Sequence, residues 1–386
     1  MIENGIPLLA KISYYLNNYD AKNANYIYHA LNQTIGRTLS IRIPELNEVK
    51  DLSGPIRVIY YKNNKYNKKI ICLGDHHQDF KYSCDEKVIT IENYLDKLFK
   101  KTDNEIDFFI EMPLPNKEYL LKKNFYIDLP KDVNMENSEQ SKWEGGYLLE
   151  TRVFAENNYK RYINKRIHFT DLRENELVAF IYLVTIDWTK NPSFDEYKRI
   201  TIKNHNFIIS LYKYFQTTIS PKYQTYDEFN IELDKSIPIN IPNYLRKEID
   251  KSPYDIKIKI RDHIIPIIYD YIHKYIYNYK ISNFKVQFLS NEQIILNTII
   301  SDIYTIMRIM KNINKSTDFK NCILYYGDNH IYHINFLLTK IFDFQQISGK
   351  KSISYDAIHL NTNSKNTDMR CIRDIIPFDK FFSASY

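Results

Sequence analysis

Cysteine and glycine are both scarce in this 386-residue chain, which has 4 cysteines and 8 glycines. The cysteines at 72, 84, 322 and 371 show no CxxC spacing, so neither a structural zinc knuckle nor a disulfide framework is indicated. Cys72 and Cys322 fall inside apolar runs and are expected to be small core residues. The cysteine pattern therefore predicts a reducing compartment.

Long hydrophobic runs and blocks of one charge are also lacking. No segment approaches the uncharged length of a membrane span, and residues 1–10 lack the basic start and apolar run of a signal peptide. The net charge is +6, but Lys and Arg are interspersed with Asp and Glu. We therefore expect a soluble protein with no clear nucleic-acid or membrane partner.

Tyrosine and phenylalanine are abundant instead, at 34 and 21 residues, and Asn, Ile and Lys recur throughout. This composition is typical of an AT-rich genome, so a single Tyr or Lys carries little information. The chain is long enough to bury a full core. Functional inference therefore depends on short motifs and on where they fall in the fold.

Two short apolar runs each end in a Gly-Asp-x-His motif. One run, at 68–73, leads into Gly-Asp-His-His at 74–77, and the other, at 322–326, leads into Gly-Asp-Asn-His at 327–330. An apolar run of strand length, ended by glycine and followed by a helical pattern, is typical of a parallel strand in an α/β sheet. In such sheets reactive groups lie just past the carboxyl ends of the strands. The two motifs therefore predict one shared site.

Further strands and helices complete the predicted fold. Residues 56–61 and the first motif strand are expected to form a hairpin, and strands are predicted at 106–113, 166–173 and 352–360. The fold class is α/β, with a mostly parallel sheet flanked by helices and a large helical insertion. We expect a helical lead-in at 1–53, a core formed by 54–174 and 320–386, and the insertion at 175–319.

Polar residues at the predicted strand tips make up the candidate site. They are Asp75, His77, Glu111, Asp171, Arg173, Asp328 and His330. With a divalent metal, of unknown identity, His77, Glu111 and His330 would be the ligands, and a bound water would be the nucleophile. Without a metal, one histidine would take a proton from water while Arg173 holds the developing negative charge.

Each candidate also has a structural interpretation. Asp75 and Asp328 follow glycines, where Asp commonly caps a helix, and Glu111 could cap a neighbouring helix. Arg173 could be a surface ion-pair partner. The repeated motif favours a site role for His77 and His330. The histidines at 168, 273, 333 and 359 are interpreted as structural.

The order of these motifs resembles a superfamily that joins Tiki-type metalloproteases, erythromycin esterases and haem-uptake lipoproteins. Its paired Gly-x-x-His motifs and strand-tip Glu correspond here to 74–77, 327–330 and Glu111. Proteins of large DNA viruses without assigned chemistry look closer still, because Gly54-Pro55, residues 109–111 and 171–173 follow their order. The resemblance covers about residues 54–345. It implies a hydrolase-like site, without naming the substrate, and a host-cytoplasmic or virion location.

Three functions are compatible with this pattern. The leading hypothesis is a hydrolase of ester or peptide bonds, possible with or without a divalent metal. A metallophosphoesterase is the second, because Asp75 to His77 reads as Asp-x-His, a typical opening of a two-metal site. The third is a non-catalytic virion or structural protein that retains the fold. Convergence of the strand-tip groups would favour an enzyme.

Overall fold

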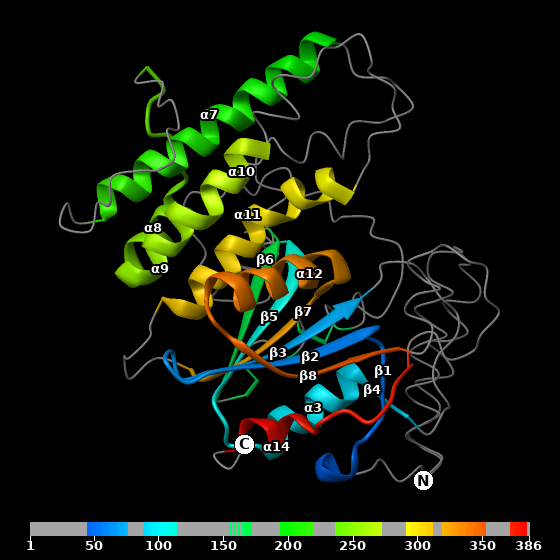
Figure 1. Cartoon of the computed structure of the whole chain (residues 1–386). Helices are drawn as coiled ribbons and strands as arrows, with labels where there is room; N and C mark the ends of the chain where they lie inside the picture. The colour runs from blue at the N-terminus through cyan, green and yellow to red at the C-terminus, as the bar shows by residue number, and fades with distance from the viewer. Residues whose placement is uncertain are drawn as a thin grey trace, which may run out of the picture. The chain divides into compact units, whose positions relative to one another are not determined.

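A six-stranded mixed sheet forms the centre of this computed structural model (Figure 1). The structure describes residues 45–75, 88–113, 151–171 in part, 194–219, 236–271, 291–311, 319–352 and 371–383. The spatial order of the strands in the sheet is β6 (Lys165–Asp171), β5 (Ile106–Pro113), β7 (Asn321–Gly327), β3 (Lys68–Asp75), β2 (Arg57–Asn63) and β8 (Gln345–Lys351).

The pairing of these strands confirms the predicted α/β class. Neighbouring strands are parallel from β6 through β5 and β7 to β3, whereas β2 is antiparallel to both β3 and β8. The predicted hairpin of β2 and β3 is present, with Arg57 opposite Gly74. Its turn contains Asn67 at φ 50°, a left-handed conformation that asparagine adopts more readily than most residues.

The two faces of the sheet are covered by different helices. Phe108 of β5 contacts Phe99 of α3 (Ile91–Lys101), with ring centroids 5.9 Å apart. Phe109 points to the opposite face and stacks on His168, which is also contacted by Arg308 of α11 (Asn291–Met310).

The hairpin strand β2 shows the same division, because Tyr60 bonds the carbonyl of Ile376 whereas Tyr61 bonds Asn335 of α12 (Asp328–Phe336). Figure 1 shows α3 and α14 (Phe378–Phe382) on one side of the sheet and α11 and α12 on the other.

This arrangement creates a topological switch point between β3 and β7. The chain continues from β3 to α3 on one face, and from β7 directly into α12 on the other face. Neighbouring parallel strands whose connections leave on opposite faces open a crevice at their carboxyl ends, where α/β proteins bind ligands. Both Gly-Asp motifs fall at the carboxyl ends of this strand pair.

Between β6 and β7 all the regular secondary structure that the structure describes is helical, as expected of the predicted insertion. These elements are α7 (Phe194–Thr218), α8 (Asn243–Lys251), α9 (Tyr254–Lys259), the π-helical turn η5 (Ile260–Ile264), α10 (Ile265–Tyr271) and α11. The π turn directly precedes Pro266, whose ring cannot continue a regular α-helical hydrogen-bond ladder. Among the helices described, none is long and apolar enough to cross a membrane.

The end of the chain packs against the sheet. Residues Phe378 and Phe381 of α14 contact the ring of Tyr60, and β1 (Leu52–Ser53), β4 (Ile89–Thr90) and β9 (Cys371–Ile372) form a second, small sheet. The helix after the second motif runs through α12 and a π-helical turn, η9 (Leu337–Ile341). The sequence analysis missed β8, because this edge strand is rich in Gln, Lys and Ser and largely exposed.

Three predictions about the rest of the chain have different outcomes. Of the helical lead-in expected at 1–53, residues 1–44 lie outside the described residues, and the described part contains only the 3-10 turn Leu46–Glu48 and strand β1. Residues 353–360 of the expected last strand also lie outside the described residues. Cys72 and Cys322 are buried free thiols, as expected, but Cys371 is disulfide-bonded. The reducing compartment predicted from the cysteine spacing therefore gains no support from Cys371.

Candidate functional site

The predicted strand-tip residues that the structure describes share the carboxyl edge of the parallel strands. Asp75, the last residue of β3, pairs with Gly327, the last residue of β7. Glu111 lies near the end of β5 on the other side of β7, and Asp171 ends β6. The order of these tips across the sheet is therefore Asp171, Glu111, Gly327 and Asp75. His77 and Arg173 lie outside the described residues, and the side chain of Asp171 is not described.

Glu111 and His330 face each other at this edge. The backbone N–H of Gly327 donates to Glu111 Oε2 at 2.6 Å, and the other carboxylate oxygen, Oε1, is 3.6 Å from His330 Nε2. Both residues are buried, with 1% and 3% of their surfaces exposed. The first turn of α12 thus fixes the Glu111 carboxylate through its backbone and presents an imidazole to it through His330.

A residue outside the predicted set completes this cluster. Asp302 of α11 is fully buried, and its Oδ1 lies 2.6 Å from His330 Nδ1. Its second oxygen, Oδ2, is 3.3 Å from Nδ1 of His333, one turn further along α12. The imidazole of His330 is therefore held between two carboxylates, one from the sheet and one from the helical insertion.

The charge state of His330 follows from these neighbours. Burial alone would lower its pKa, because a charged imidazole is poorly solvated in the protein interior. The negative charges of Asp302 and then Glu111 outweigh burial and raise the pKa to about 10. His330 is therefore an imidazolium at neutral pH, able to donate protons from both ring nitrogens.

Asp328 has a structural partner in the hairpin. Arg57 Nη2 donates to Asp328 Oδ2 at 2.9 Å, and both side chains are almost fully buried. A Cβ atom at Gly74 would collide with Oδ1 of Asp328 and lie 3.3 Å from Cβ of Arg57. The glycine of the first motif thus makes room for the aspartate of the second, which gives the two motifs a shared packing reason.

A second charged cluster lies on the same face of the sheet, further from the carboxyl edge. Arg166 binds both oxygens of Asp107 at 2.6 Å, and His168 Nε2 is 2.7 Å from Asp107 Oδ1. Burial would raise the pKa of Asp107, but His168 and Arg166 outweigh burial and hold this pKa well below its usual range. Asp107 therefore stays ionised.

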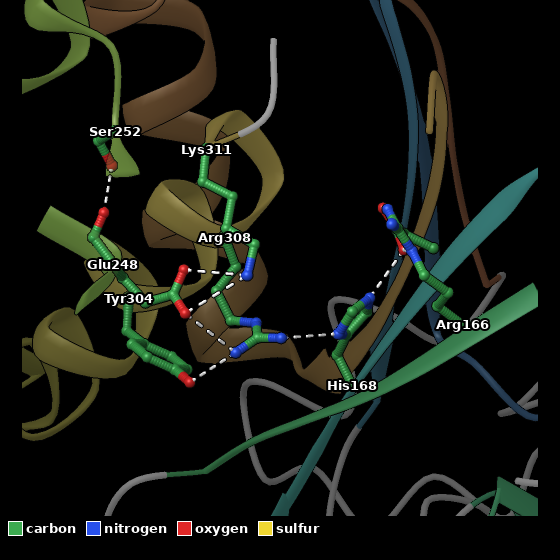
Figure 2. Close-up of polar contacts among 8 residues, drawn as sticks. Arg166, His168, Glu248, Ser252, Tyr304, Arg308 and Lys311 are labelled. Atoms are coloured by element: carbon green, nitrogen blue, oxygen red, sulfur yellow. Dashed lines mark hydrogen bonds and ion pairs between the residues drawn. The ribbon is translucent and has the colours of Figure 1, made fainter. Parts of the chain in front are cut away.

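Helix α11 contributes Arg308 to this second cluster (Figure 2). Arg308 Nη2 lies 3.1 Å from His168 Nδ1, and Nη1 bonds Tyr304 at 3.0 Å and Glu248 of α8 at 3.3 Å. Because Arg has only donors, Nδ1 of His168 must accept, so its proton is on Nε2 and points to Asp107. Burial lowers the pKa of His168 to about 4, and the ring is neutral at pH 7.

Hydroxyl groups lie between the two clusters. Tyr326 of β7 bonds Thr170 of β6 and, at 3.0 Å, Thr305 of α11. The side of α11 that faces the sheet is thus polar at Asp302, Thr305 and Arg308. Every one of these positions meets a polar group of the sheet or of α12.

The fit of a metal ion depends on residues beyond this cluster. His330 Nε2 and Glu111 Oε1 could be two ligands, and a carboxylate behind Nδ1 is the usual support of a metal-bound histidine. Asp328 is engaged by Arg57. Within the described residues there is no group of three or more His, Cys, Asp or Glu side chains that could hold a metal. A metal centre would therefore need a ligand from outside the described residues, where the predicted ligand His77 lies.

Sequence reasoning missed Arg57 and Asp302, although each leaves a signal. Arg57 opens an apolar strand, and the predicted hairpin would have placed it level with Gly74. Asp302 lies in a helix between apolar stretches, with Thr305 three residues after it and Arg308 three residues after Thr305. Charged residues on the apolar side of a helix need buried partners, so both residues could have been proposed.

No family model, no curated protein and no solved structure matches the chain.

Proposed function

We propose that this protein is a hydrolase of ester or peptide bonds whose chemistry takes place at the carboxyl edge of β3, β5 and β7. The observation that carries the proposal is the buried pair of His330 Nε2 and Glu111 Oε1, 3.6 Å apart beside a topological switch point. Paired Gly-Asp-x-His motifs and their resemblance to hydrolases support the same interpretation.

In this mechanism the two side chains divide the proton transfers. Glu111, held by the N–H of Gly327, accepts a proton from the attacking water at Oε1. His330, charged at neutral pH, donates its Nε2 proton to the leaving oxygen or nitrogen. The proton on Glu111 then returns to His330 and restores both groups. Arg173 is proposed to hold the charge that develops on the substrate carbonyl oxygen, and His77 to bind water or a metal.

A panel of substrates tests the proposal. The purified protein is assayed on nitrophenyl esters, peptide anilides and nitrophenyl phosphate, with chelator and with added Zn²⁺ or Mn²⁺. We expect ester or peptide hydrolysis that Glu111→Gln and His330→Gln each reduce about 10²–10⁴-fold. His263→Gln, at an exposed histidine of η5, is the matched control and should keep the wild-type rate. Hydrolysis of the phosphate ester alone, with two metals bound, would favour a metallophosphoesterase instead.

A non-catalytic structural role is the second candidate, and one observation favours it. Asp302, His330 and Glu111 are each at most 3% exposed and lie within ion-pair distance of one another, as a polar lock in a core would. Such a lock predicts that Glu111→Gln lowers the melting temperature while the wild-type protein hydrolyses nothing in the panel.

A further inference from the structure

The helical insertion contributes a side chain to the strand-tip site, and that side chain is Asp302. We propose that Asp302 is a positioning residue, which fixes the ring of His330 so that Nε2 faces Glu111. This inference rests on the hydrolase proposed above for its catalytic consequence, whereas the positioning itself can be measured without any activity.

The carboxylate of Asp302 makes a short contact with Nδ1 of His330. Asp302 Oδ1 is 2.6 Å from His330 Nδ1, the short distance of a charge-assisted hydrogen bond, and Asp302 has no exposed surface. Water therefore does not compete for this contact. Among the described residues, the only other acidic group within ion-pair distance of this ring is Glu111, on the opposite nitrogen.

The two possible orientations of the His330 ring place different atoms against Glu111. A half-turn of the ring about its bond to Cβ would exchange nitrogen and carbon positions and direct carbon instead of Nε2 toward Glu111. The hydrogen bond from Nδ1–H to Asp302 selects one of the two orientations and keeps a proton on Nδ1. Nε2 is then the nitrogen that faces Glu111, whatever its own protonation.

The second oxygen of Asp302 lies near another histidine of α12. Oδ2 lies 3.3 Å from His333 Nδ1, so one carboxylate contacts two histidines on successive turns of α12. Asp302 thus joins α11 to the helix that carries His330. It follows that the insertion completes the site and does more than cover it.

Asp302→Asn tests the proposal, because the amide has the same shape but one donor and one acceptor instead of two acceptors. We expect kcat to fall on the order of 10–100-fold with KM little changed. Thr305→Val is the matched control: it removes a buried polar group one turn along the same face of α11 and leaves Asp302 intact. It should retain the wild-type kcat.

Nuclear magnetic resonance of selectively ¹⁵N-histidine-labelled protein gives the readout that is independent of activity. The wild-type protein should show a strongly hydrogen-bonded proton on His330 Nδ1, assigned by its loss in His330→Gln. Asp302→Asn should lose or shift this signal, and Thr305→Val should keep it.

Two outcomes would overturn the proposal: an unchanged Nδ1 signal in Asp302→Asn, or an equal loss of kcat in Thr305→Val. If the wild-type protein hydrolyses nothing, the proposed function fails alone, and the resonance data still decide the positioning role.

Discussion

His168, with 14% of its side chain exposed, and His330, with 4%, both lie beneath α11, and each has one ring nitrogen bonded to an aspartate, yet their charges differ. At His168 the other nitrogen meets Arg308, and at His330 it faces Glu111. The pKa of the first is lowered to about 4 and that of the second is raised to about 10. Burial and an Asp partner are common to both, so the second neighbour decides which histidine is charged.

This difference separates a structural cluster from a candidate reactive one. Around His168 every charge has an opposite partner, and a neutral ring with both nitrogens engaged has no proton to exchange. Around His330, two carboxylates share one imidazolium, so a proton can move to Glu111 or to a substrate. The same face of the sheet thus contains an inert histidine and one suited to acid–base chemistry.

The largest expected effect is the loss of stability at alkaline pH caused by His330. Because its folded pKa lies above the unfolded value, its contribution is complete below about pH 6.5 and is lost as the pH rises through 10. The shift corresponds to roughly 4–5 kcal/mol at most. Urea unfolding across this range should show a steeper decline for wild type than for His330→Gln. If the free energy of unfolding declined equally with pH in wild type and His330→Gln, His330 would not be charged.

Next in size is the effect of removing Arg308, the cation that adds to burial in keeping His168 neutral. Arg308→Met leaves Glu248 with a weaker set of cationic partners and deprives His168 Nδ1 of its donor. We expect a loss of about 3–4 kcal/mol in the free energy of unfolding and a higher pKa for His168, followed by nuclear magnetic resonance.

Lys311→Met is the matched control for Arg308→Met. Lys311 also pairs with Glu248, at 3.3 Å. It should cost less stability and leave the pKa of His168 unchanged. An equal change of that pKa in both variants would contradict the assignment of Arg308 as the deciding neighbour.

At acidic pH the free energy of unfolding should depend on His168, with the opposite sign to its dependence on His330 at alkaline pH. The pKa of His168 in the folded state lies below the unfolded value, so between about pH 6.5 and 4 only the unfolded chain takes up a proton. Stability should therefore fall as the pH is lowered through this window, by on the order of 3 kcal/mol. His168→Gln should flatten the acid limb between these values. A wild-type curve as flat as that of the variant would show that His168 is already charged near pH 7.

The contrast also shows which parts of the molecule a sequence can predict. Apolar runs that end in Gly-Asp place their residues at one edge of a parallel sheet, because strand direction and period are local properties. The edge positions of Asp75, Glu111 and Asp328 follow from that reasoning. Strand β8 did not, since its polar residues conceal an edge strand.

The charge of a histidine depends instead on contacts between distant segments. His168 follows a strand-like pattern and His330 a motif, but nothing near either one indicates that Arg308 or Glu111 will be its second neighbour. Asp302 likewise comes from a helix whose docking on α12 no spacing rule describes. The sequence can therefore indicate where polar groups gather, while the fold decides which of them carry charge.

The smallest expected effect comes from a single methyl group at the first motif. Gly74→Ala would force Asp328 away from Gly74 and disturb its bond to Arg57. Asp328 opens the helix that carries His330, so we expect a loss of about 1–3 kcal/mol and a changed His330 resonance. His168, on β6, should keep its resonance.

Gly349→Ala is the control, because its new Cβ would meet the flexible end of Gln346 on an exposed strand. If Gly74→Ala shifted both histidines equally, the two clusters would be coupled through α11, and the difference between them would not be local.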